Sequence, residues 1–191
     1  MAGGSTTSGL SAGTASIAVC VDGGSIEIRN CHLYTDTGAA VVVQGTSASA
    51  IIAQSRMGPC GWFAQSKAGY AVLTRNGGHA SVLNSDLYML SQSGVVAYQS
   101  ASTAYVNRCT IGPCLLSAIA AEGMRVELQA QDVNVVDIKW REVAEFDGGE
   151  VVFLDEAGKQ EEQSYQTKNS KCRPARKARA DEGGDMPGIG V

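Results

Sequence analysis

Bulky aromatic residues are scarce in this chain of 191 residues, which contains two Trp and three Phe. Gly, Ala, Ser and Val are abundant instead, and small or β-branched side chains favour closely stacked strands with tight corners over a bulky helical core. The formal net charge of -4 is too small to predict a nucleic-acid or membrane surface. No apolar run approaches the length of a transmembrane helix.

Motifs that would indicate a cofactor, a metal or a nucleophile are also missing. The six Cys contain no C-x-x-C pair, and His32 and His79 are too few and too separated to complete a zinc site with them. No G-x-S-x-G, G-x-G-x-x-G or P-loop motif occurs. We therefore expect no catalytic residue, no cofactor and no metal site.

Signals for secretion are absent from the sequence as well. Residues 1–13 lack the charged and apolar regions of a signal peptide, and no Asn is followed two places later by Ser or Thr. With no oxidising compartment indicated, the thiols are expected to be reduced and to pack as small apolar side chains. These features favour a cytoplasmic protein with a flexible N-terminal segment at 1–13.

The chain does contain a six-residue pattern that returns every 22 to 30 residues, as IRNCHL at 28–33, IAQSRM at 52–57, VLNSDL at 82–87 and VNRCTI at 106–111, with a fifth unit expected at 128–133. Its first column is mostly aliphatic: Ile28, Ile52, Val82, Val106 and Leu128. Its second column is mostly polar: Asn30, Gln54, Asn84, Arg108 and Ala130. The third column holds Cys31, Ser55, Ser85, Cys109 and Gln131. The fourth is large and apolar: Leu33, Met57, Leu87, Ile111 and Val133.

A second strand signal, such as GAAVVV at 38–43, precedes each unit, and Gly-Pro-Cys follows two units, at 58–60 and 112–114. Apolar residues alternate with a period of two and no unit has room for a helix, which excludes leucine-rich and helical solenoids. The expected fold is therefore all-β, a coil of parallel strands with about five turns over residues 14–137. Cys31 and Cys109 are expected to be packing residues at a crowded corner, too far apart to form a disulfide.

The repeated V/I-x-N-S/C-x-L pattern resembles the right-handed parallel β-helix repeats of pectate lyases, sugar hydrolases and CASH-type domains, and most of all the short repeats of the last group. The resemblance covers roughly residues 14–137 and implies a right-handed coil. It also implies a hydrogen-bonded ladder of Asn side chains at one corner. Asn30 and Asn84 match that ladder and Gln54 substitutes in it. Arg108 and Ala130 depart from it, so any ladder here is incomplete.

The remainder of the chain breaks the repeat. Two apolar runs flank Asp147-Gly148-Gly149, which predicts a hairpin at 138–157 that caps the open end of the coil. Residues 158–191 are predicted to form a disordered, charged tail. No amphipathic segment precedes the first turn, so the N-terminal edge is expected to be uncapped or covered by another chain.

The resemblance makes a polysaccharide lyase or glycoside hydrolase the first enzymatic hypothesis. Such an enzyme needs clustered carboxylates on one outer face. The nearest match is one outward column with His32, Arg56 and Asp86, and Asp132 is predicted to share that column. A solvated face is the simpler interpretation of this stripe. Trp62 and Phe63, in the irregular third unit, either plug the local core or extend this stripe into an interaction patch.

The sequence favours a non-catalytic structural or protein-interaction module within a larger intracellular assembly, such as a cytoskeletal or ciliary one. Partners would be other proteins, bound through the uncapped N-terminal edge, a flat face or the tail; neither a membrane nor nucleic acid is expected. The alternative is a carbohydrate-active β-helix enzyme or a fragment of one. The basic cluster of the tail is a further possible contact: Lys171, Arg173, Arg176, Lys177 and Arg179.

Overall fold

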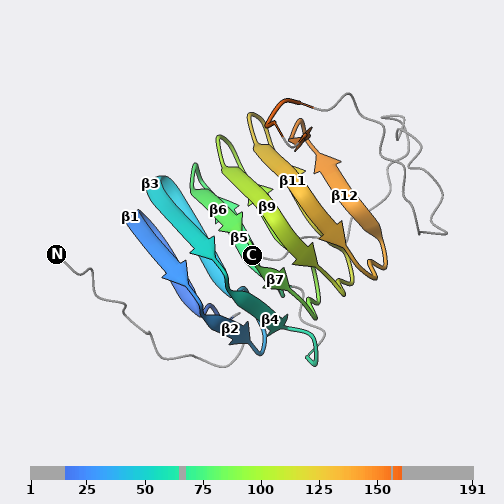
Figure 1. The fold of residues 1–191 in the computed structure, drawn as a ribbon. Helices are drawn as coiled ribbons and strands as arrows, with labels where there is room; N and C mark the ends of the chain where they lie inside the picture. Colours follow the sequence, from blue (N-terminus) through green and yellow to red (C-terminus); the bar gives the residue numbers. More distant parts are fainter. Residues whose placement is uncertain (1–15, 65–67, 156, 161–191) are drawn as a thin grey trace.

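The computed structural model describes residues 16–64, 68–155 and 157–160, and these form a parallel β-solenoid of about six turns with no helix among them (Figure 1). Its thirteen strands belong to one continuous hydrogen-bonded sheet. They are β1 (Val19–Arg29), β2 (His32–Thr35), β3 (Val41–Ala53), β4 (Arg56–Cys60), β5 (Val72–Arg75), β6 (His79–Leu83), β7 (Asp86–Leu87), β8 (Val95–Tyr98), β9 (Thr103–Ile111), β10 (Ser117–Glu122), β11 (Glu127–Val135), β12 (Arg141–Phe146) and β13 (Glu150–Leu154). The predicted fold class is thus confirmed.

The coil has three faces, which are defined by the parallel pairing of strands in successive turns. The first face contains the start of β1 and of β3, followed by β5, β8, β10 and β12. The second face contains the end of β1 and of β3, then β6, the first part of β9 and of β11, and β13. The third face contains β2, β4, β7 and the last part of β9 and of β11.

The interior consists of stacked apolar columns, one or more from each face. Val19, Val41, Val72, Val95, Ile119 and Val143 stack on the first face. Ile28, Ile52, Val82, Val106, Ala130 and Phe153 stack on the second. Side chains in the middle turns are almost completely buried, and each such Val, Leu or Ile contributes roughly 1.5–3 kcal/mol of hydrophobic stabilisation.

The predicted columns hold through four turns and shift by two residues in the fifth. Val106 pairs with Ala130 rather than Leu128, and Cys109 pairs with Val133 rather than Gln131. The position after Asp86 and Thr110 is therefore Asn134, so the prediction that Asp132 shares the column of Asp86 is wrong. A slip of two residues preserves the inside–outside alternation of a strand, so the hydrophobic pattern alone could not detect it.

The corner between the second and third faces is turned by one residue with positive φ in each of five turns. These residues are Asn30 (52°), Gln54 (52°), Asn84 (47°), Arg108 (53°) and Asp132 (49°). The hydrogen bonds that link successive turns at this corner are made by the residue that follows the positive-φ residue, in the column of Ser55 and Ser85. Ser55 Oγ accepts from the Cys31 N–H (3.2 Å) and donates to the Ala53 carbonyl (2.8 Å). Ser85 Oγ accepts from the Ser55 N–H (3.1 Å) in the same way, so serine hydroxyls link successive turns.

The hairpin expected at 138–157 is replaced by a sixth turn of the coil. β12 pairs in parallel with β10, and β13 pairs in parallel with β11. Asp147 and Gly148, with φ of 50° and 83°, turn the corner between the first and second faces. Two apolar runs around Asp-Gly-Gly suit a hairpin or a corner equally, and here both runs continue an existing stack. The predicted segment 1–13 and almost all of 158–191 lie outside the described residues.

Candidate interaction surface on the third face

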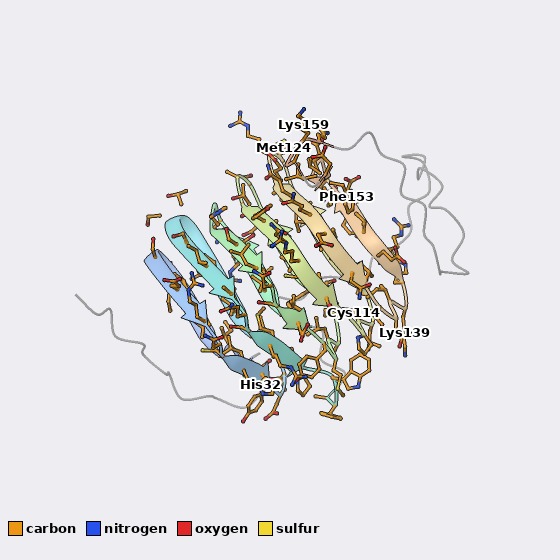
Figure 2. All side chains as sticks on the ribbon, viewed as in Figure 1. His32, Cys114, Met124, Lys139, Phe153 and Lys159 are labelled. Carbon is orange, nitrogen blue, oxygen red and sulfur yellow. The ribbon has the colours of Figure 1, made fainter. Side chains whose placement is uncertain are left out.

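Three predicted patch residues lie side by side on the outer side of the third face. His32 of β2 is in register with Arg56 of β4, and Arg56 is in register with Asp86 of β7. Because their inward neighbours Met57 and Leu87 are fully buried, Arg56 and Asp86 point outward. Figure 2 shows His32 beside β2 at the edge of the coil. The sequence prediction of one outward column is confirmed for these three residues.

Tyr88 joins this column into one cluster. Its hydroxyl lies 2.6 Å from Nε2 of His32, which is two turns away, and the same Nε2 lies 2.9 Å from the Gly58 carbonyl oxygen. A carbonyl oxygen can only accept, so this contact assigns the proton to Nε2. The Arg56 guanidinium carbon lies 4.9 Å from the centre of the Tyr88 ring, within the range of a cation–π contact. We call His32, Arg56, Asp86 and Tyr88, together with Tyr34, the third-face cluster.

Tyr34, like Tyr88, is a member of the cluster that the repeat pattern did not identify. Its ring centre lies 6.0 Å from that of His32, and its side chain is exposed. The available signal was the period of two, since a residue two places after an outward His32 on one strand also points outward. Exposed aromatic rings beside an Arg are typical of protein interfaces.

Glycine makes the close packing beneath this cluster possible. A Cβ on Gly58 would lie 1.8 Å from the Tyr88 carbonyl oxygen, and φ at Gly58 is 133°. Gly112 repeats the arrangement two turns later, where a Cβ would lie 1.7 Å from the Val136 carbonyl oxygen. The two Gly-Pro-Cys segments therefore occupy equivalent corners. Their thiols stack into the interior through Leu90, in the order Cys60, Leu90, Cys114.

Among the described residues, the charged side chains of the cluster form no ion pair with one another. The ion pairs found within the described ranges are Glu27 with Arg29 and Arg108 with Asp132, both outside the cluster. Asp86 is exposed, and Arg56 faces the Tyr88 ring. In the described part of the chain, no group of three or more His, Cys, Asp or Glu is placed to hold a metal ion. The cluster thus offers hydrogen-bond donors and aromatic rings on an open surface.

Trp62 and Phe63 follow directly after β4. Phe63 is 80% exposed, whereas Trp62 is half-buried. Of the two interpretations of this pair, exposure therefore favours the interaction patch for Phe63. The predicted tail contacts at 171–179 lie outside the described residues.

The first turn leaves one end of the apolar interior accessible. Ile26 occupies an interior position, yet it is 37% exposed, whereas its partner Ala50 in the second turn is 1% exposed. Within the described ranges, β1 pairs with β3 and with no strand on its other side. A shallow hollow of about 220 Å3 lies at this end and is lined by Ser16, Ile17, Ala18, Tyr34, Thr35 and Asp36. This end is therefore continuous with the third-face cluster through Tyr34.

The buried cysteines behave as packing residues. Burial raises the pKa of Cys109 to about 11 and that of Cys114 to about 12, so both thiols stay protonated and poorly nucleophilic at neutral pH. Cys31, which was also expected to pack, is exposed because it lies in the first turn, and its Sγ donates to the Arg29 carbonyl (3.2 Å).

No family model, no curated protein and no solved structure matches this chain. Among the described residues there is no helix long and apolar enough to cross a membrane.

Proposed function

We propose that this chain is a non-catalytic structural module that docks onto another protein through the open end of its first turn and the adjoining third-face cluster. The observation that carries this proposal is the exposure of Ile26 at an interior position of the coil. An exposed core end beside a strand with one unpaired edge among the described residues favours association, because docking removes apolar surface from water and supplies missing strand hydrogen bonds.

The third-face cluster would add specificity to this docking. Tyr34, Tyr88 and Arg56 are of the residue types that dominate binding energies at interfaces. The His32–Tyr88 hydrogen bond and the stacking of strands hold them in place before binding, which reduces the entropy lost on association. A cytoplasmic assembly, cytoskeletal or ciliary, remains the predicted setting.

Matched isoleucine substitutions test the docking surface. Ile26 lies at the open end, and Ile51 lies on the outer side of the second face with a comparable exposure of 43%. Full-length chains carrying Ile26→Lys or Ile51→Lys would be used to isolate partners from the native source, with stoichiometry from mass spectrometry. A stoichiometric protein partner that is lost with Ile26→Lys and kept with Ile51→Lys is the expected result. Equal recovery with both variants would contradict docking at this end.

The carbohydrate-active alternative has weaker support from the geometry. His32 is engaged by Tyr88 and Gly58, and the hollow at the first turn is lined by residues 16–18 and 34–36, without His32, Arg56 or Asp86. Polysaccharide cleavage by the intact chain that disappears in Asp86→Asn would reverse the order of the two hypotheses.

A further inference from the structure

The first turn of the coil, residues 19–35, has the same layout when it is read from either end. Its first-face segment is 19–22 and its third-face segment is 32–35, and the second-face segment 25–29 lies between them. Corners at 23–24 and 30–31 separate the three segments. Glu27 is therefore the middle residue of the turn, and a two-fold rotation through it exchanges segments of equal length.

That rotation keeps the alternation of inward and outward side chains. If two first turns met in this way, each residue would face the residue equally far from Glu27 on the other side. The first face of one copy would then meet the third face of the other, and the two apolar interiors would join. The inward pairs would be Ile26 with Ile28, Val21 with Leu33, and Val19 with Thr35.

The outward side chains are complementary under the same rotation. Asp22 would face His32 of the partner subunit. Nε2 of His32 is already bonded within its own chain, so Nδ1 is the nitrogen left to meet this carboxylate. Ser25 would face Arg29 of the partner subunit. Glu27 would face a like charge at the axis, but its carboxylate forms an ion pair with Arg29 of its own chain, which offsets the repulsion.

The edge that such a contact would use is open among the described residues. There β1 pairs only with β3, and β2 pairs only with β4 (Figure 1). Ile17 is 41% exposed, Ile26 37% and Tyr34 62%, and all three lie at this end. A free strand edge beside exposed apolar side chains is a template for pairing with another chain.

The opposite end of the coil carries a charge at an interior position. Ala97 and Ala121 belong to the interior, and the next residue in their column is Glu145 of β12. Glu145 is exposed at this end, and its carboxylate accepts a hydrogen bond from the Val151 N–H (2.8 Å). An inward-pointing charge at a sheet edge opposes pairing with another chain. Head-to-tail stacking of copies would need this end, so it is disfavoured.

We propose that two copies of this chain associate through their first turns as a closed dimer whose two-fold axis passes through Glu27. The strands run antiparallel across the joint: the second-face part of β1 pairs with its own copy, and the start of β1 pairs with β2 of the partner. Because only the first turn takes part, the assembly ends at two copies. This inference rests on the proposed function, since it names a second copy as the partner at the open end.

A cysteine at the axis tests this geometry directly. Opposite residues of an antiparallel pair have Cα atoms about 4.5–5.5 Å apart, which suits a disulfide. In the full-length chain with the exposed thiols removed (Cys20→Ser, Cys31→Ser), Glu27→Cys should therefore form a covalent dimer under air. Ile51→Cys is the matched control, because Ile51 follows Glu27 in the same outward column. Two copies of residue 51 would lie about 14 Å apart, too far to bridge.

The rate of covalent dimer formation would be followed by intact-mass spectrometry at low micromolar concentration. It is expected to be about tenfold or more higher for Glu27→Cys than for Ile51→Cys. Sedimentation equilibrium of chains without introduced cysteines gives the second readout. Ile26→Lys should raise the dissociation constant of the dimer about tenfold or more, because it places a charge in the joined interior. Ile51→Lys should leave that constant unchanged, and far-ultraviolet circular dichroism checks that both variants fold.

Four results would overturn the dimer. The first is a monomeric chain with no preference for the disulfide at residue 27; recovery of a different protein that depends on Ile26 would then still support the proposed function. The second is a dimer that survives Ile26→Lys, which would place the contact elsewhere. The third is an assembly larger than two copies, which would indicate head-to-tail stacking. The fourth is a dimer that forms only after deletion of residues 1–15, which would identify those residues as the occupant of the open end.

Discussion

The outer sides of the first and third faces are built from the same repeat, yet one is apolar and covered and the other is aromatic, charged and exposed. On the first face, Val42, Val96 and Ala120 are buried although they point outward. On the third face, Arg56 and Asp86 are exposed at positions that alternate with fully buried ones. Stacking of the interior requires only every second residue of a strand, so the outward positions are free to differ between faces. The difference shows that one repeat can carry an apolar, buried outer side on one face and a polar, open outer side on another.

The largest effect is expected where the third face depends on close backbone approach. Gly58→Ala places a Cβ 1.8 Å from the Tyr88 carbonyl oxygen and should lower the free energy of unfolding by about 3 kcal/mol or more. Gly148→Ala is the control, because Gly148 also has positive φ (83°) but no atom lies within 4 Å of the added Cβ. It should cost about 1–2 kcal/mol, and denaturant unfolding of both variants measures the difference. Equal losses would mean that Tyr88 does not lie against Gly58 as described.

Two outward residues of the same strand test the contrast between a covered and an uncovered outer side. Val42→Ala removes two methyl groups from a buried site and should cost roughly 2 kcal/mol, counting transfer and residual cavity. Ile51→Ala removes more carbon from a half-exposed site and should cost about 1 kcal/mol or less. Denaturant unfolding with unchanged m-values measures both. A larger loss for Ile51→Ala would remove the distinction between the two faces.

These faces also show how far the sequence could predict the structure. The stacking of columns such as Ile28, Ile52 and Val82 followed from identical spacing in successive units, because parallel strands in a coil align like residues. The fifth-turn register and the sixth turn were missed, since a two-residue slip and an Asp-Gly-Gly corner leave the alternation of apolar residues unchanged. The uninterrupted run Val41-Val42-Val43 did carry a signal for the buried outer side of the first face, because strands buried on both sides lack alternation.

The third-face cluster was predictable only in part. The shared column of His32, Arg56 and Asp86 followed from the repeat, but the reach of Tyr88 over two turns depends on side-chain rotamers and on the absence of a Cβ at Gly58. The sequence also could not predict that Tyr70 packs on the outer side of the first face, because Tyr70 lies in an irregular connection before β5.

The first face also carries a carboxyl group, that of Glu122, whose pKa is shifted. Burial, together with the charge of Asp147, raises the pKa of Glu122, which lies at the edge of this face. The folded-state pKa of Glu122 is above its unfolded-state pKa. The contribution of Glu122 to folding stability is therefore fully present at a pH below the unfolded-state pKa, and it is lost as the pH rises through the folded-state pKa. Glu122→Gln should remove this pH dependence and leave the variant slightly more stable than the wild-type chain at neutral pH. Denaturant unfolding midpoints of both chains, measured from about pH 4, near the ordinary pKa of Glu, to about pH 8, give the slope of stability against pH. Identical slopes in both chains would show that Glu122 is as hydrated in the folded state as in the unfolded state.

The smallest effect is expected from the hydroxyl that joins the third-face cluster. Tyr88→Phe removes the 2.6 Å contact with His32 but keeps the ring that faces Arg56. Because the bond is exposed and water can replace it, the loss of stability should be below about 1 kcal/mol. The amount of partner recovered should nevertheless fall clearly. Without the hydrogen bond, the side chains of His32 and residue 88 are no longer held in place before binding, so ordering them adds an entropy cost to association. His79→Ala is the matched control, because His79 is also exposed and bonded to a hydroxyl, that of Thr103 at 2.7 Å, but lies on the second face. If Tyr88→Phe and His79→Ala reduce recovery equally, the third-face cluster has no special role in binding, and docking depends on the open end of the first turn alone.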